Sequence, residues 1–119
     1  MRIAVILLAF LTGTASAYPD KPVRLLLTFA AGGQADLLAR SVTEKMRGPF
    51  GQPIVVEPRP GAGGNLAMEA AAKAPPDGYT LVFGTPAVAI NGSLYRKLSY
   101  DPLQDLTPLP IVCVTTFLD

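Results

Sequence analysis

The 119-residue chain carries ten Lys and Arg against nine Asp and Glu, a formal net charge of +1, and half of its residues are hydrophobic. A balance so close to neutral argues against nucleic acid or an anionic membrane surface as a partner. One cysteine and no histidine exclude a disulfide-stapled scaffold, Ser-His-Asp and Cys-His catalysis, and the commonest metal ligand.

The first 17 residues have the order of a secretory signal. Arg2 gives a positive start, residues 3–11 are an unbroken apolar run, and Ala15-Ser16-Ala17 is a small-x-small cleavage site. The run is too short for a stable membrane anchor, and a buried N-terminal helix is the less favoured alternative. We therefore expect cleavage before Tyr18. The mature chain, residues 18–119, is expected to be periplasmic, without membrane insertion, and to have zero net charge because Arg2 is lost.

The first expected elements are a strand and an amphipathic helix. Residues 23–29 are apolar apart from Arg24, which predicts a buried strand. Residues 36–47 follow a glycine-rich turn and read as a helix, which Gly48-Pro49 is expected to stop. Its expected buried face carries apolar residues at four-residue spacing, namely Leu38, Val42 and Met46.

The same succession continues along the chain. Residues 54–57 read as a second strand, 64–74 as an alanine-rich helix and 80–83 as a third strand. Strand–helix–strand–helix–strand with short connections predicts right-handed crossovers and a parallel sheet, that is, an α/β fold.

Beyond residue 84 the pattern is less regular. Asn91 is expected to cap a single helical turn, residues 99–102 to be extended, and residues 109–116 to form a fourth strand. A fresh apolar strand with no element to cover it suggests a truncated chain. We expect such a chain to be marginally stable and to expose an apolar edge.

Two glycine-rich turns are the strongest functional signal. Ala30-Ala31-Gly32-Gly33-Gln34 and Pro60-Gly61-Ala62-Gly63-Gly64 each lie between an expected strand and an expected helix. Such turns present unpaired helix-start N–H groups and allow close backbone approach, a design suited to carboxylate or phosphate. The third position of a dinucleotide fingerprint falls on Leu66, so that motif is not complete. Asp36 is either a functional carboxylate at this crevice or a helix-start residue.

A series of motifs in chain order resembles the Bug-type receptors, the extracytoplasmic solute-binding proteins of tripartite tricarboxylate transporters. The resemblance covers the whole mature chain, although Thr28, Ala31, Pro58 and Ala67 depart from the usual pattern. The motifs are Tyr18-Pro19-x-Lys21-Pro22-Val23-Arg24, Phe29-Ala30-x-Gly32-Gly33-x-x-Asp36, residues 51–57, Arg59-Pro60-Gly61-Ala62-Gly63-Gly64-Asn65, residues 76–81, Asn91-x-Ser93-Leu94-Tyr95 and Tyr100-Asp101-Pro102.

The resemblance implies the first lobe of a two-lobed periplasmic-binding-protein fold, truncated, with the second lobe absent. It implies a small carboxylate or related organic acid as ligand, membrane subunits of a transporter as partners, and no catalysis, metal or cofactor. The ligand-binding residues predicted from these motifs are Phe29, Gly32, Gly33, Asp36, Gly63, Gly64, Asn65 and Thr85.

Two other functions remain open. One is a small secreted enzyme that uses Asp36 and Glu57 as acid and base. The other is a non-functional product of a truncated gene. For the receptor itself, we expect carboxylates to bind weakly or not at all, because one open lobe does not remove the ligand from water.

Overall fold

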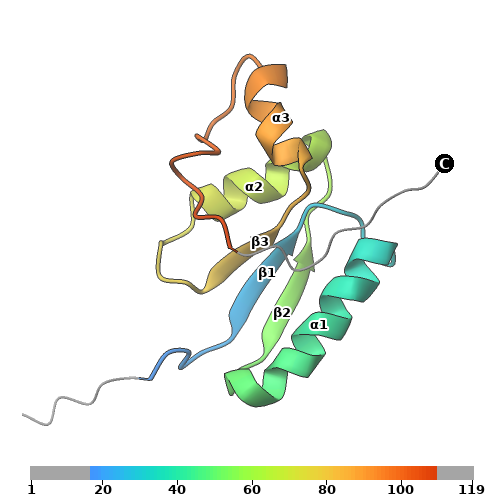
Figure 1. Ribbon diagram of the computed structural model, residues 1–119, viewed down its shortest axis with the longest axis vertical. Coiled ribbons are helices and arrows are strands. Elements are labelled where there is room, and N and C mark those ends of the chain that lie inside the picture. Colours follow the sequence, from blue (N-terminus) through green and yellow to red (C-terminus); the bar gives the residue numbers. More distant parts are fainter. Residues whose placement is uncertain (1–16, 110–119) are drawn as a thin grey trace, which may run out of the picture.

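The fold is a three-stranded parallel sheet flanked by helices, seen in a computed structural model that describes residues 17–109 (Figure 1). The strands are β1 (Val23–Leu27), β2 (Ile54–Pro58) and β3 (Thr80–Phe83), in the order β2-β1-β3. Both pairings are parallel: Leu25 lies opposite Val56 on one side and opposite Leu81 on the other. The predicted parallel α/β class is therefore confirmed.

The helices connect and cover these strands. They are α1 (Gln34–Phe50), the short 3-10 helix η1 (Ala62–Gly64), α2 (Asn65–Ala72) and α3 (Ala87–Leu94). Helix α1 packs on β2, and α2 packs on β3 and β1. Because the chain moves from β1 to β2 and then returns past β1 to β3, right-handed crossovers place α1 and α2 on opposite faces of the sheet.

The core is centred on β1, the middle strand. Leu26, Leu27 and Val23 of β1 are at most 1% exposed, and Ala39 of α1 and Met68 of α2 are buried against the sheet. The outer strands are less covered: every residue of β3 is half-buried, and Val55 of β2 is 46% exposed. The apolar core is therefore centred on β1, while α1 packs chiefly on β2 and α2 packs on both β3 and β1.

Two helix boundaries differ from the predictions. Helix α1 runs through Gly48-Pro49 to Phe50, so the expected stop was wrong. The helix ends instead at Gly51, whose left-handed backbone (φ 75°) lets its N–H donate to the carbonyls of Arg47 and Gly48. Ala39 and Thr43 form the buried face with half-buried Leu38 and Val42, whereas Met46 is 40% exposed.

The other difference lies after β3. The single turn expected at Asn91 is wrong, because α3 begins at Ala87 and Asn91 lies inside it. Strand β1 also ends at Leu27, two residues earlier than expected. Of the predicted fourth strand, residues 110–116 lie outside the described residues, and Leu109 is exposed and not in a strand. The predicted signal, residues 1–17, lies outside them apart from Ala17.

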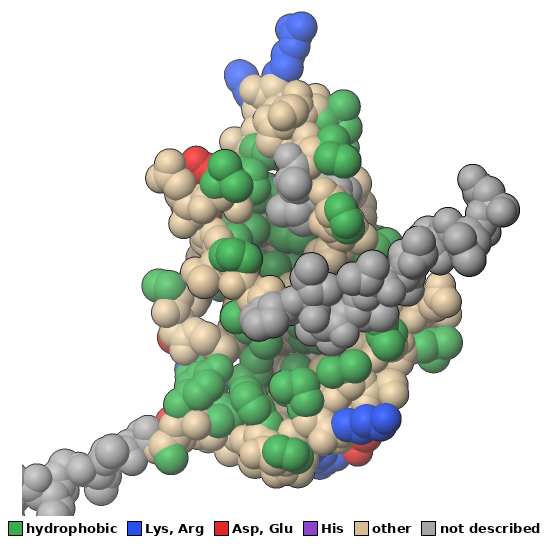
Figure 2. Space-filling view, in the orientation of Figure 1, with side chains coloured by type: hydrophobic (Ala, Val, Ile, Leu, Met, Phe, Trp, Pro, Cys, Tyr) green, Lys and Arg blue, Asp and Glu red, His purple; other side chains and the backbone are tan. Residues whose placement is uncertain are grey.

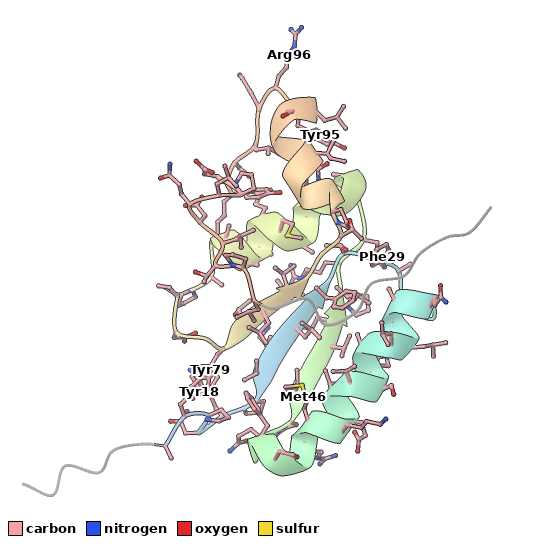
Figure 3. The ribbon with its side chains drawn as sticks, in the orientation of Figure 1. Tyr18, Phe29, Met46, Tyr79, Tyr95 and Arg96 are labelled. Carbon is pink, nitrogen blue, oxygen red and sulfur yellow. The ribbon has the colours of Figure 1, made fainter. Side chains whose placement is uncertain are left out.

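At the amino edge of the sheet, Tyr18 contacts the turn before β3 and the end of α1, a set of contacts that we call the Tyr18 clasp (Figure 3). Tyr18 Oη donates to the carbonyl of Gly78 at 2.7 Å, and the Tyr18 ring packs edge-on against the rings of Tyr79 and Phe50. Lys21 Nζ lies 4.3 Å from the centre of the Tyr79 ring. These contacts join the N-terminus, the end of α1 and the β3 turn. No helix within residues 17–109 has the length and apolar character that crossing a bilayer requires.

Candidate functional site

The candidate site lies at the carboxyl edge of the sheet, where three turns begin. Residues 28–33 follow β1, residues 59–64 follow β2 and residues 84–86 follow β3. Because all three strands are parallel, these turns share one edge, as predicted (Figure 1). The connection after β1 leads to β2 on one side of β1, and the connection after β2 leads to β3 on the other side. A topological switch point therefore lies between β1 and β3. Open α/β sheets bind ligands at such points.

The second turn crosses the end of β1 rather than standing apart from it. The N–H of Arg59 donates to the carbonyl of Leu27 at 2.8 Å. Thr28, the residue after β1, in turn donates through Oγ1 to the carbonyl of Phe83 on β3 at 3.2 Å. A Cβ atom built on Gly64 would lie only 3.1 Å from the Thr28 Cβ. The ends of all three strands are therefore bound together around Thr28.

The glycines of the second turn are required by its backbone. Gly61, Ala62, Gly63 and Gly64 have φ angles of 127°, 48°, 64° and 90°. Glycine adopts such positive φ angles at low cost because it has no Cβ atom, whereas Ala62 takes up the left-handed region that residues with a side chain seldom adopt. The N–H of Gly64 closes the turn by donating to the carbonyl of Gly61 at 2.9 Å. The turn thereby leads into α2 over the end of β1.

The side chain of Asp36 stabilises the first turn by hydrogen bonding. This side chain is 5% exposed, with Oδ2 accepting from the N–H of Gly32 and Oδ1 from Arg40 Nε, both at 2.9 Å. The hydrogen bond from Arg40, and then that from Gly32, hold the pKa of Asp36 below its usual value. Asp36 therefore remains anionic and is engaged with the turn and its own helix. This is a helix-start role of the kind that the sequence left open beside a ligand-binding one.

Backbone donors remain at the start of α1. Gly33 is the N-cap residue, and the N–H of Leu37 donates to its carbonyl at 3.1 Å. The N–H groups of residues 34–36 precede the first intrahelical bond, so they have no intrahelical acceptor. They carry the partial positive charge of the helix end. Phe29, in the same turn, is 37% exposed.

Asn65, the first residue of α2, is the centre of a buried polar network. Its Oδ1 accepts from Asn91 Nδ2 at 2.9 Å and from Tyr100 Oη at 2.8 Å. Asn91 Nδ2 also donates to the carbonyl of Gly63 at 3.2 Å. Sequence reasoning did not find this role for Asn91 or Tyr100. The available signal was an asparagine directly after the apolar run of residues 87–90.

A cavity of about 730 Å³ is not formed by the glycine-rich turns. It lies between α3 and residues 98–103, and Thr85 is the only predicted ligand-binding residue that lines it. Tyr95 also lines this cavity, while its hydroxyl lies 3.1 Å from where a Cβ on Gly63 would stand. The second glycine-rich turn and the cavity are therefore neighbours, with the Tyr95 side chain between them.

Charge is sparse over much of the molecule. On the face that Figure 2 shows, Lys and Arg gather beyond α3 and at the C-terminal end of α1, and hydrophobic side chains are spread between them. In Figure 3, Arg96 points away from the fold at the tip beyond α3. The basic side chains beside the glycine-rich turns, Arg40 and Arg59, are about half exposed, and each is paired with a carboxylate, Asp36 and Glu57 respectively.

The second carboxylate considered for catalysis, Glu57, is also paired. Arg24 donates to its two oxygens at 2.7 and 2.8 Å, and this hydrogen bonding is the largest cause that lowers the pKa of Glu57. An acid catalyst needs a raised pKa to hold its proton near neutral pH. The pKa values of Asp36 and Glu57 are both lowered instead. Within residues 17–109, no three His, Cys, Asp or Glu residues gather in a metal-binding group.

Comparison with known families gives one match over most of the chain. Residues 38–118 match the model of the tripartite tricarboxylate transporter family receptor, TctC. A UPF0065 protein of Bordetella bronchiseptica is 40% identical over 118 residues, which cover 96% of this chain and 35% of the relative. The chain thus spans about a third of the length of that relative.

Solved structures agree with this match. The periplasmic binding protein BugD is 40% identical with a TM-score of 0.70, over 74% of this chain and 29% of BugD. MatC of Rhodopseudomonas palustris, solved with bound malate, is 43% identical with a TM-score of 0.65, over 76% of this chain and 31% of MatC. The predicted resemblance to Bug-type receptors is therefore confirmed.

Proposed function

The chain belongs to the tripartite tricarboxylate transporter receptor family, TctC, and we propose on that premise that it binds a small organic acid for such a transporter in the periplasm. The membrane subunits of the transporter are the proposed partners. Binding takes place at the carboxyl edge of the sheet, where the turns after β1, β2 and β3 meet.

The observation that carries this proposal is that two glycine-rich turns, each leading into a helix, lie at the same carboxyl edge of the sheet as the β1/β3 switch point. The first turn offers the N–H groups of residues 34–36, and the second brings the start of α2 over Thr28. Helix starts favour anions through both their unpaired donors and their dipoles. A carboxylate is small enough to accept from such backbone donors without a basic side chain.

The relatives support a carboxylate as the ligand class. MatC, which is 43% identical to this chain, carries malate. A dicarboxylate has anionic groups at both ends, so one group can face the turns while the other remains for other contacts. We propose Phe29, Gly32, Gly33, Gly63, Gly64, Asn65 and Thr85 as the wall that the ligand meets, with Asp36 supporting it through Gly32.

Binding without chemistry fits the two carboxylates better than catalysis does. Asp36 is paired with Arg40, and Glu57 with Arg24, and the pKa of each carboxyl is lowered. BugD is also a binding protein. Incubation of the chain with organic acids is therefore expected to leave them unchanged. Conversion of a tested acid would favour the enzyme alternative.

The affinity of this chain alone is expected to be low. Most small-molecule sites bury the greater part of their ligand, whereas an edge of one sheet leaves water in competition for the carboxylate. A dissociation constant of about 1 mM corresponds to about 4 kcal/mol of binding free energy. We expect binding in this range or weaker.

Amide resonances of the ¹⁵N-labelled chain, recorded during titration with malate, test the proposal at low affinity. The expected result is saturable shifts for residues 34–36 and for Gly63 and Gly64. Malamide, the diamide of the same carbon skeleton, is the matched control, because it lacks the negative charge. The proposed function would be contradicted if malate caused no shifts, if malamide caused shifts of equal size, or if the shifts occurred only at the amino edge of the sheet.

A further inference from the structure

The polar network at the start of α2 fixes which atom of Asn65 remains available. Asn91 Nδ2 donates to the carbonyl of Gly63, and a carbonyl oxygen accepts only. This sets the orientation of the Asn91 amide, whose nitrogen also faces Asn65. Asn65 must therefore present its oxygen to Asn91, and the two amide orientations are determined together.

The oxygen of Asn65 is then fully occupied. Oδ1 has two lone pairs, and it accepts from both Asn91 Nδ2 and Tyr100 Oη. Its Nδ2 donates to no group within residues 17–109, yet no buried side-chain nitrogen or oxygen in that range lacks a partner. Nδ2 of Asn65 therefore retains contact with solvent, although the residue as a whole is only 7% exposed.

We propose that Asn91 and Tyr100 are positioning residues that hold Asn65 with its oxygen inward and its N–H₂ group outward, as a ligand donor at the end of the second turn. The inference rests on the proposed function and adds a cause of ligand specificity to it. A site that offers only donors accepts a carboxylate and disfavours a ligand that presents an N–H or ammonium group there, since two donors do not pair.

The burial of the network is what makes this orientation firm. Tyr100 is 7% exposed and Asn91 4% exposed, and burial is the largest cause that raises the pKa of Tyr100. Its hydroxyl therefore keeps its proton and donates it to Asn65. Reversing the Asn65 amide would leave that O–H facing Nδ2 and would also set Nδ2 against Asn91 Nδ2, a buried donor–donor contact.

The decisive variant is Asn65→Asp. Aspartate retains an oxygen for Asn91 and Tyr100, and its negative charge is compatible with a helix start, so the fold should remain. The outward donor, however, becomes an acceptor. We expect the melting temperature to stay close to that of the original chain and the affinity for malate to fall about tenfold or more, the loss typical of a charge-assisted hydrogen bond.

Two further variants complete the experiment. Gln52→Glu adds the same charge before β2 at the opposite edge of the sheet, and it should leave malate binding unchanged. Tyr100→Phe removes one partner of Oδ1 and is expected to lower malate affinity several-fold. In the ligand-free chain, the side-chain N–H₂ protons of Asn65 should exchange with water faster than those of Asn91, because both Asn91 protons are donated.

The outcomes separate the two proposals. If the original chain does not bind malate, the proposed function fails and this inference fails with it. If the chain binds malate and Asn65→Asp binds it equally well, only the donor role of Asn65 is overturned. Protected Asn65 protons beside exchanging Asn91 protons would overturn the orientation itself, as would a Tyr100→Phe variant with unchanged affinity.

Discussion

Gly64 and Thr28 approach each other so closely that a Cβ atom on Gly64 would lie 3.1 Å from Thr28 Cβ and 3.2 Å from its Cγ2. Thr28 follows the middle strand, and Gly64 precedes α2. Their contact is the point at which the second turn crosses the sheet, so it determines where the start of α2 lies relative to the first turn.

Gly64→Ala should therefore destabilise the chain. The substitution places a side chain at φ 90° and against Thr28, and strained backbone of this kind costs about 1–3 kcal/mol. Gly48→Ala is the matched control: Gly48 lies inside α1, and a Cβ there meets nothing within 4 Å. That change should raise stability by about 0.5–1 kcal/mol through helix propensity. Urea unfolding of both variants measures the difference, and equal midpoints would contradict the close approach.

Asp36→Ala should lower the melting temperature more than Asp36→Asn. Alanine removes both acceptors and leaves the Gly32 N–H without its partner, while asparagine retains one oxygen for that N–H. Both substitutions break the ion pair with Arg40. Thermal unfolding by circular dichroism is the measurement. A difference in the reverse order would mean that the Gly32 contact does not stabilise the first turn.

Stability should fall as the solution is acidified. The pKa values of Asp36 and Glu57 are lowered in the folded chain from reference values of 3.8 and 4.5. A lowered folded-state pKa contributes stability that is present above the unfolded pKa and is lost as pH falls through the folded one. Unfolding free energies measured from pH 7 down to pH 3 should therefore decrease below about pH 4.5.

The Glu57→Gln variant identifies the source of part of that decrease. Glutamine does not titrate, so the variant should be less stable than the original chain at pH 7 and should lose less stability between pH 5 and pH 3. Parallel pH curves for the two proteins would show that the Arg24–Glu57 pair does not contribute to the pH dependence.

The strands were predictable because each is a short apolar run between strong turn signals. Residues 54–57 and 80–83 match β2 and β3 to within one residue. The end of α1 was not predicted correctly, because the helix was expected to stop at Gly48-Pro49. Pro49 lies in the last turn of the helix, and the chain is redirected two residues later by Gly51, which supplies the left-handed conformation. Local signals here indicated the region of the helix end rather than its residue.

The polar network was beyond sequence reasoning for a different reason. Asn91 and Tyr100 lie 26 and 35 residues from Asn65, and no local pattern relates positions so far apart. The same contacts explain why α3 extends beyond one turn: Asn91 anchors the middle of a helix that contains Gly92 and Ser93, both poor helix formers. The glycine-rich turns, by contrast, were identified because the positive φ angles of Gly32, Gly61, Gly63 and Gly64 favour glycine, which is visible in the sequence itself.

Loss of the Tyr18 clasp should destabilise the amino edge. Tyr18→Phe removes the hydrogen bond to Gly78 but keeps the ring against Tyr79 and Phe50, while Tyr18→Ala removes both. Since Tyr18 is 56% exposed, the phenylalanine variant should lose about 0.5 kcal/mol and the alanine variant more. Hydrogen exchange at Gly78 and Tyr79 should accelerate in the same order. Unchanged exchange in both variants would show that the clasp is not held in solution.

The Tyr18 clasp and the glycine-rich turns lie at opposite edges of the sheet. Tyr18 is fastened at the amino edge of the sheet, whereas the glycine-rich turns lie at the carboxyl edge, the length of the strands away. A chain held at a membrane by a leader before Tyr18 would present its binding edge outward, toward the solute, and its clasped edge toward the bilayer.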